Sequence, residues 1–251
     1  MQIVGYRPAV EDAADLLVAE DGAVERVSLT PGSELAYTLG ERHCAGVLDG
    51  DRHERCPAGR APHCEIHTDR WPCARCRGDC ALPLESCREE HAVYLAAFAP
   101  DTFKVGVTRS WRLERRLREQ GADRAAHLRT VADGRIARQI EADIAREVGD
   151  RVRVPEKIDG LHRTVDDGAW SALLADRDPI ETFAFDYGLD LVDRPVSETM
   201  AAGTVVGTKG KVLVIRAGET VYAVNARDLI GCELTRGPPD RDRQSSLGAF
   251  G

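Results

Sequence analysis

Residues 92–109 read AVYLAAFAPDTFKVGVTR, and this stretch decides the fold. The apolar run AVYLAAF is followed by a turn, APDT, and then by a second extended run, FKVGVT. Two short runs joined by a tight turn are typical of a β-hairpin. The sequence therefore predicts two paired antiparallel strands here.

A helix and a further strand are expected directly after this hairpin. Ser110 is placed to cap a helix over residues 111–120, and Gly121 is placed to end that helix. Residues 124–132, RAAHLRTVA, contain a third expected strand. Strands and helices thus alternate within a short length of chain.

A second helix is marked by apolar residues at every fourth position. It begins after Gly134 and ends at Gly149. The recurring side chains between them are Ile136, Ile140, Ile144 and Val148. At about 100° per residue, Glu141 lies at the border of this apolar stripe and not on the opposite, solvated face.

Strands are also expected toward both ends of the chain. Four short strands separated by turn residues are predicted within residues 1–40, and residues 204–235 return to strands, with a hairpin around Ala217-Gly218. Residues 155–200 have a helical and mixed pattern. We expect the C-terminal strands to pack with residues 1–40 into one β unit.

These elements predict an α+β fold, with a small mixed sheet and helices preceded by a cysteine-rich segment and flanked by N- and C-terminal strands. The expected regions are an N-terminal strand region at 1–42, a zinc-binding segment at 43–90, a sheet-and-helix domain at 91–155, a helical then β-rich region at 156–235, and a disordered tail at 236–251.

Seven of the eight cysteines lie between residues 44 and 87, together with several histidines. A secreted disulfide module would have a similar density, but the N-terminal residues contain no apolar stretch of the kind found in a signal peptide. Glycine and proline recur between the cysteines, as tight chelating turns require, and long apolar side chains are few. Metal binding therefore accounts for this segment better than disulfides do.

The spacing of these residues favours two structural zinc sites. One predicted set of ligands is Cys73, Cys76, Cys80 and Cys87, in which CxxC spacing lets two thiolates hold one Zn²⁺. The other set is Cys44, Cys56, Cys64 and His67. Three alternatives stay open: His63 in place of His67, interleaved sites, and a single zinc with buried thiols. Cys232, in an apolar stretch, is expected in a core.

The charge of the chain is unevenly distributed. The 251 residues carry a formal net charge of −8, which excludes a uniformly basic protein that coats nucleic acid. Residues 92–155 nevertheless carry thirteen basic and nine acidic side chains, a net charge of +4. A local excess of this kind can attract a polyanion.

The ordinary composition, with 43% hydrophobic and 30% charged residues, excludes a disordered or fibrous protein. Because aromatic residues make up only 5%, the core must consist mainly of aliphatic side chains. No apolar run approaches the ~18–20 residues that span a bilayer. We therefore expect a cytoplasmic protein without a membrane partner, and the oligomeric state stays open.

The order of these elements resembles the GIY-YIG nuclease superfamily over roughly residues 92–150. The two triplets of that superfamily are matched by Val93-Tyr94-Leu95 and Lys104-Val105-Gly106, followed by Arg116 on the first helix and Glu141 on the second. The chain is also similar to an uncharacterised prokaryotic family that joins a cysteine-rich zinc segment to the pattern VYLA…KVGVTR…QGA.

The resemblance implies a phosphodiesterase site. Glu141 would hold Mg²⁺ or Mn²⁺, the Tyr94 phenol would serve as an acid/base or orienting group, and Arg116 would face the developing charge. Lys104 stands where the superfamily has its second tyrosine; a lysine can still contact phosphate, but it does not simply replace a phenol as a proton-transfer group near neutral pH. The residues expected to hold flanking phosphates are Arg109, Arg112 and Arg115.

The sequence therefore predicts a zinc-containing protein that binds DNA or RNA, with endonuclease activity as the catalytic possibility. Binding ranks ahead of cleavage, because Lys104 replaces the tyrosine and Gln120 replaces a histidine of the pattern. The alternatives are a non-catalytic nucleic-acid-binding module and a zinc-stapled protein–protein adaptor. At the level of residues, Tyr94 could be a core aromatic, Glu141 could pair with Arg138, and the arginines could form a solvated helix face.

Overall fold

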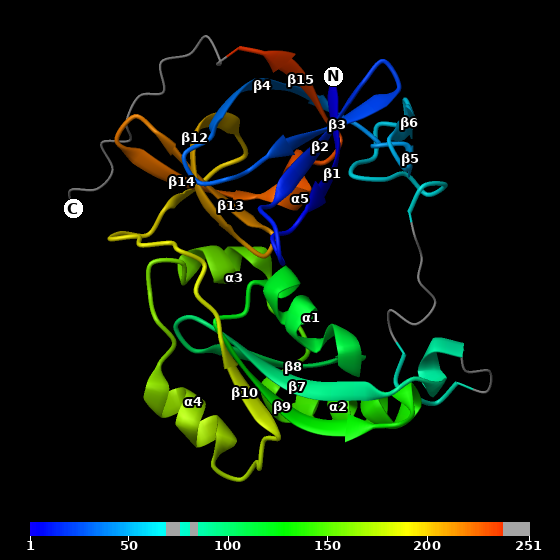
Figure 1. The fold of residues 1–251 in the computed structure, drawn as a ribbon, viewed down its shortest axis with the longest axis vertical. Helices are drawn as coiled ribbons and strands as arrows, with labels where there is room; N and C mark the ends of the chain where they lie inside the picture. Colours follow the sequence, from blue (N-terminus) through cyan, green and yellow to red (C-terminus); the bar gives the residue numbers. More distant parts are fainter. Residues whose placement is uncertain (69–75, 81–84, 238–251) are drawn as a thin grey trace. The chain divides into compact units, whose positions relative to one another are not determined.

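The computed structural model describes residues 1–68, 76–80 and 85–237 and divides the chain into two compact units (Figure 1). Unit 1 comprises Met1–Thr68, Pro195–Thr208 and the residues from Val212 onward. Unit 2 comprises Asp69–Arg194 and Lys209–Lys211. The boundary between them falls within the predicted zinc segment. The predicted tail lies outside the described residues from residue 238 onward.

Unit 1 is built on a sheet that joins the two ends of the chain. Within the described residues it has eleven strands in the order β11-β14-β13-β12-β4-β15-β1-β2-β3-β6-β5. The strands are β1 (Gln2–Arg7), β2 (Asp15–Glu20), β3 (Ala23–Ser28), β4 (Glu34–Arg42), β5 (Val47–Asp49), β6 (Arg52–Glu54), β11 (Val196–Ser197), β12 (Ala201–Lys209), β13 (Val212–Ala217), β14 (Thr220–Asn225) and β15 (Cys232–Arg236). The C-terminal strands thus pair with the N-terminal ones, as expected.

The core of unit 1 is mainly aliphatic, as the low aromatic content requires. Side chains from distant parts of the sequence are fully buried in it, including Ile3, Leu16, Met200 and Leu213. Cys232 is also buried, at 4% exposure, as expected for a core thiol. A short helix, α5 (Ala226–Leu229), connects β14 to β15. Burial of these aliphatic side chains drives the folding of the unit.

Unit 2 contains a four-stranded antiparallel sheet in the order β10-β9-β7-β8. Its strands are β7 (His91–Phe98), β8 (Thr102–Arg109), β9 (Arg124–Val131) and β10 (Glu181–Ala184). The strands β7 and β8 form the predicted hairpin, in which Tyr94 lies opposite Gly106 and Ala96 lies opposite Lys104. The chain therefore has the α+β class that the sequence predicts.

Helices cover both faces of this sheet (Figure 1). Because side chains alternate along a strand, Val93 and Leu95 of β7 pack toward α2, whereas Tyr94 and Phe98 pack toward α1. The helical elements of unit 2 are a 3-10 turn η2 (Glu85–Arg88), a second 3-10 turn η3 (Ser110–Arg112), α1 (Leu113–Gln120), α2 (Gly134–Val148), α3 (Val154–Asp159) and α4 (Asp167–Leu174).

The sequence predicts the end of α1 correctly but not its beginning. Gly121 ends α1 in the left-handed conformation, with φ +70°, as predicted. The predicted cap by Ser110 is wrong: Ser110 lies in η3, and its buried hydroxyl has no hydrogen-bond partner among the described residues. The side chain of Asp133 caps α2 by accepting from the backbone N–H of Arg135 at 2.7 Å.

The apolar stripe of α2 also differs from the prediction at one position. Ile140, Ile144 and Val148 pack against the core, whereas Ile136 is 49% exposed near the start of the helix.

Residues 155–200, whose sequence has a helical and mixed pattern, contain the helix α4 and the edge strand β10. In the described part of the chain, no helix has both the length and the apolar character needed to cross a bilayer.

Candidate functional site

Unit 1 contains a cluster of three thiols and an imidazole. The ligand-type atoms of Cys44, Cys56, Cys64 and His67 all lie within 4.8 Å of one another. His67 Nδ1 is 3.3 Å from the sulfur of Cys44 and 3.4 Å from that of Cys64. The sulfurs of Cys56 and Cys64 are 4.0 Å apart. These are the four residues expected for one zinc site, and His67 belongs to the cluster instead of His63.

The backbone around Cys44 presents N–H groups to its sulfur. The amides of Gly46 and Cys64 donate to Cys44 Sγ at 3.4 and 3.2 Å. Gly46 adopts φ +68°, and a Cβ at that position would collide with the carbonyl oxygen of Glu54. Backbone hydrogen bonds from His67 and Ile66 lower the pKa of the Cys64 thiol to about 7. The contacts to Cys64 favour the thiolate form that binds a metal.

The geometry of this cluster fits a tetrahedral metal ion. Four ligands at the zinc–sulfur distance of about 2.3 Å place two sulfurs about 3.8 Å apart, close to the separation of Cys56 and Cys64. Three thiolates and one imidazole are a donor set that Zn²⁺ prefers. With all four positions filled by protein, no position is left for a substrate. The Cys3His cluster can therefore hold a metal ion in a structural role.

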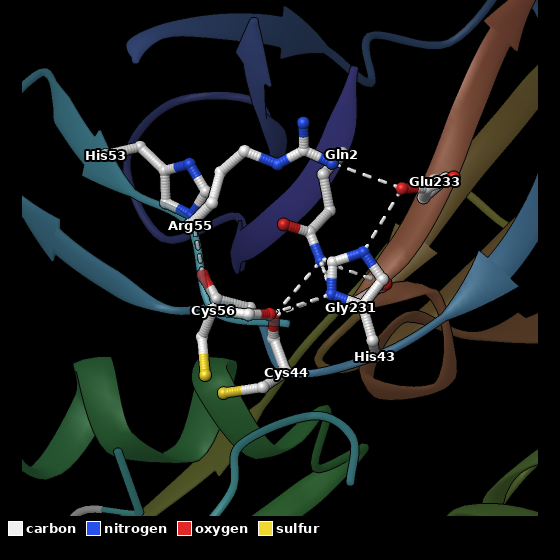
Figure 2. A network of polar contacts seen from close by, with 9 residues as sticks. Gln2, His43, Cys44, His53, Arg55, Cys56, Gly231 and Glu233 are labelled. Carbon is white, nitrogen blue, oxygen red and sulfur yellow. Dashed lines mark hydrogen bonds and ion pairs between the residues drawn. The ribbon is translucent and has the colours of Figure 1, made fainter. Parts of the chain in front are cut away.

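A polar network ties the ligand-bearing loops to the sheet (Figure 2). The Gln2 amide on β1 donates to the carbonyl oxygens of Cys44 and Gly231 at 3.2 and 3.1 Å. The His43 ring lies 3.1 Å from the carbonyl oxygens of Cys44 and Cys56, and its other nitrogen is 3.3 Å from Glu233 of β15. This network holds two ligand positions against strands from both ends of the chain.

The second predicted zinc site is described only in part, because Cys73 lies outside the described residues. The amide of Gly78 donates to Cys76 Sγ at 3.3 Å, the same turn that Gly46 makes with Cys44. Burial and the neighbouring Cys76 and Cys87 raise the pKa of the Cys80 thiol. Among the described residues, only the Cys44, Cys56, Cys64 and His67 cluster has all its ligand atoms within 4.8 Å of one another. Joint binding of a metal by Cys76, Cys80 and Cys87 stays a prediction.

Unit 2 contains a cavity of about 810 Å³ that is lined by residues of β7, β8, η3, α1 and α2. The side chains that line it include Cys76, Cys87, His91, Tyr94, Lys104, Arg109, Arg112, Arg116, Arg135, Arg138, Glu141, Asp150 and Arg151. All four predicted catalytic residues and two of the three predicted phosphate-binding arginines therefore share one cavity. Arg115 does not line it: this side chain is 59% exposed and pairs with Glu119.

The charge of the cavity wall is strongly positive. Seven of the cavity-lining side chains are lysine or arginine, and only Glu141 and Asp150 are acidic. The carboxylate of Glu119 on α1 accepts from the guanidinium groups of Arg112, Arg115 and Arg116 at 3.1–3.5 Å. One carboxylate therefore holds three arginine side chains in place but cannot neutralise all three charges.

Tyr94 is fully buried at the base of this cavity. Its ring packs against Gly106 on the neighbouring strand, where a Cβ would lie 2.5 Å from the phenol oxygen. This close approach explains why glycine occupies position 106. The Tyr94 oxygen accepts a hydrogen bond from the Gln120 side chain at 2.8 Å. Burial raises the pKa of Tyr94, so that the phenol keeps its proton at neutral pH.

Lys104 differs from an ordinary surface lysine. Burial and the positive charge of Arg116 lower its pKa to about 8. Its ammonium donates to the backbone carbonyl of Asp150 at 3.4 Å. A lysine at its usual pKa is unsuited to proton transfer near neutral pH, and burial reduces this obstacle at Lys104. Near pH 8 this group exists in both protonation states.

Glu141 lies at the edge of the cavity, with its side chain 13% exposed, which agrees with its expected place at the border of the α2 stripe. Its Oε2 accepts from Arg138 at 2.7 Å, one helical turn away. The pairing of Glu141 with Arg138 that the sequence allowed is therefore present. A cation bound by Glu141 would have to compete with Arg138.

The four lysines of the chain form a group that no sequence pattern indicated. The pKa of Lys157 is lowered to about 7 by burial and by the charges of Lys104, Lys211 and Lys209. Its ammonium donates to the Gln120 carbonyl at 2.7 Å. From the sequence alone, the presence of only four lysines beside thirty arginines indicates a bias in composition. In the structure, the four lysines lie close together and add positive charge near the end of α1.

Three further arginines on the cavity wall were not predicted from the sequence. Arg135 and Arg138 lie one turn apart on α2, and Arg151 follows that helix. The spacing of Arg138 and Glu141 was available in the sequence. Nothing in the sequence pattern showed that these cations would line the same cavity as Arg112 and Arg116.

Comparison with known proteins identifies the family but no activity. The model of DUF2797, described as "Protein of unknown function", matches residues 59–234. No curated protein and no solved structure matches the chain. Because the matched residues span more than half of its length, the chain belongs to the DUF2797 family.

Proposed function

We propose that the cavity of unit 2 binds the phosphodiester backbone of a nucleic acid. The observation that carries this proposal is the set of seven cationic side chains that line one cavity against two carboxylates. Phosphate groups are the ligands that guanidinium groups bind with paired hydrogen bonds. A volume of about 810 Å³ is large enough for a nucleotide-sized part of such a polymer.

The arginines of this cavity are ordered before a ligand binds. Arg109 is held by Glu89 at 3.1 Å, and Arg112 and Arg116 are held by Glu119 at 3.2 and 3.5 Å. Side chains that are already ordered lose less conformational entropy when they contact a phosphate. The cluster therefore favours a bound polyanion more than a scattered set of surface arginines would.

Hydrolysis of the bound phosphodiester is the second candidate function. It is favoured because Tyr94, Lys104 and Glu141 line the same cavity as the arginines. Lys104, with a pKa of about 8, can accept or donate a proton near neutral pH. Mg²⁺ or Mn²⁺ at Glu141 would polarise the phosphate, once Arg138 releases that carboxylate. Binding ranks first because it needs no such rearrangement.

The test compares the full-length protein with variants in DNA and RNA binding by fluorescence anisotropy. Arg112→Ala combined with Arg116→Ala should reduce affinity for an oligonucleotide at least tenfold. Arg194→Ala, an exposed arginine of unit 2 that does not line the cavity, should change it little. Equal affinity of all three proteins would contradict the proposal, and binding of only an acidic protein would favour the adaptor alternative.

Cleavage is tested separately on the same oligonucleotides with Mg²⁺ or Mn²⁺. If the cavity is catalytic, Glu141→Gln should abolish cleavage and retain binding, because it removes the charge but keeps the size of the side chain. Cleavage that survives this substitution would exclude the proposed catalytic site. Intact binding without cleavage in the unmodified protein would identify a binding module.

A further inference from the structure

Trp111 is an exposed indole beside the cationic cavity. It lies in η3 and is 68% exposed, whereas Trp170, the other tryptophan in the described residues, is buried. Arg109 and Arg112, which flank Trp111 closely in sequence, both line the cavity. An exposed large aromatic side chain at the edge of a binding site calls for a reason other than core packing.

The indole is held in place although it is exposed. Its Nε1 donates to Glu89 at 3.2 Å, and the other oxygen of the same carboxylate accepts from Arg109 at 3.1 Å. The guanidinium groups of Arg109 and Arg112 lie 4.9 and 5.8 Å from the centre of the Trp111 ring. These contacts fix the ring next to the two cations without burying it.

We infer that Trp111 is a stacking platform for an unpaired base of the nucleic acid whose phosphates occupy the cavity. The substrate is then single-stranded, or carries unpaired nucleotides where it meets this protein. This inference rests on the proposed function, and it adds the class of nucleic acid that the site selects.

The position of the Trp111 ring beside the arginines of the cavity supports this assignment. Proteins that bind single strands combine a positive groove for the backbone with aromatic rings on which bases stack. Bases in a duplex are already stacked on one another, so their faces are not available to an indole at the protein surface. Because Arg109 and Arg112 contact both the ring and the cavity, a phosphate and a base of one strand can be bound side by side.

A purely structural role for Trp111 makes a different prediction. If the ring served only to position Arg109 and Arg112, its loss would weaken single-stranded and duplex ligands equally. If it stacks on a base, its loss would weaken the single-stranded ligand selectively. Phenylalanine would restore much of that loss, because it keeps an aromatic face but lacks the Nε1 donor to Glu89.

The experiment measures binding of a fluorescein-labelled single-stranded 12-mer and of the matching duplex to the full-length protein. We expect the single strand to bind more tightly. Trp111→Ala should weaken single-strand binding about tenfold and leave duplex binding within about twofold. Trp111→Phe should recover most of the affinity, and Ile180→Ala, which removes another exposed apolar side chain of unit 2, should have no effect.

Two results would overturn the inference. If Trp111→Ala reduces both ligands equally or neither, while the Arg112→Ala and Arg116→Ala pair abolishes binding, the proposed function stands and the stacking role is wrong. If neither ligand binds the unmodified protein, the proposed function fails and the inference fails with it. Quenching of tryptophan fluorescence by the single strand, lost in Trp111→Phe, would support the stacking role directly.

Discussion

Substitution of one cysteine in the Cys3His cluster tests the metal centre most sharply. Cys64→Ser replaces a thiolate whose sulfur lies 3.4 Å from His67 Nδ1 and 4.0 Å from the sulfur of Cys56. Cys232→Ser is the matched control, because Cys232 is a buried thiol of the same unit that is not part of the cluster. Both variants remove one sulfur, but only the first removes a ligand.

The expected magnitude follows from the number of ligands. A four-ligand structural zinc site has an apparent binding free energy of about 10–16 kcal/mol at neutral pH. An equal share for each ligand is about 2.5–4 kcal/mol, so that Cys64→Ser should weaken zinc binding by about two to three powers of ten. The melting temperature of unit 1 should fall by about 10 °C.

Local packing gives little compensation for this loss. In the segment from Cys44 to His67, the buried residues other than ligands are Ala45, Gly46 and His53. One alanine contributes little apolar burial to a segment of this length. The loops between the ligands should therefore lose their structure when the metal is removed.

The assay combines zinc content, chelator competition and thermal unfolding. Zinc should be lost from Cys64→Ser at chelator concentrations that leave the unmodified protein and Cys232→Ser loaded. Unchanged zinc content and affinity in Cys64→Ser would refute the cluster as a metal centre. An equal loss in Cys232→Ser would show that the effect is general destabilisation.

Four further predictions concern unit 2. Gly106→Ala should destabilise the fold by about 1–3 kcal/mol in thermal unfolding, because the new methyl group meets the Tyr94 ring. Lys209→Ala should cost about 3–5 kcal/mol in denaturant unfolding, since it leaves the carboxylate of Asp123 without the buried ammonium that both of its oxygens contact at 2.6 and 2.7 Å. Oligonucleotide affinity should fall as pH rises through about 8, where Lys104 loses its charge, and Lys104→Met should flatten that step. The unfolding free energy should rise with pH between about 8 and 10.5, because the unfolded chain holds the Lys104 proton longer, and Lys104→Met should remove this rise.

Local sequence signals predicted the elements that short-range physics determines. The hairpin of β7 and β8, the end of α1 at Gly121 and the end of α2 at Gly149 depend on residues close together in the chain. The ligands Cys44, Cys56, Cys64 and His67 were identifiable because cysteine and histidine at close spacing are typical of a structural metal site. The wrong cap at Ser110 reflects a 3-10 turn that propensity does not reveal.

Other features depend on contacts between distant segments. The placement of β15 between β4 and β1, and the cavity lined by residues of β8, α1 and α2, arise from tertiary packing. The shift in the pKa of Lys104 likewise depends on burial and on Arg116, which only the folded chain supplies. The role of Trp111 was not predicted because an exposed aromatic in a short turn has no periodic signal.

The salt dependence of oligonucleotide binding tests the central claim most directly. The cavity has an excess of five positive side chains over acidic ones, and neutralising about five phosphates of a single strand gives a slope of about −3.5 in log affinity against log salt concentration. Between about 50 and 200 mM salt, affinity should therefore fall about a hundredfold. The Arg112→Ala and Arg116→Ala pair should reduce the slope by about 1.4. An affinity independent of salt, or an unchanged slope in that pair, would contradict phosphate binding in this cavity.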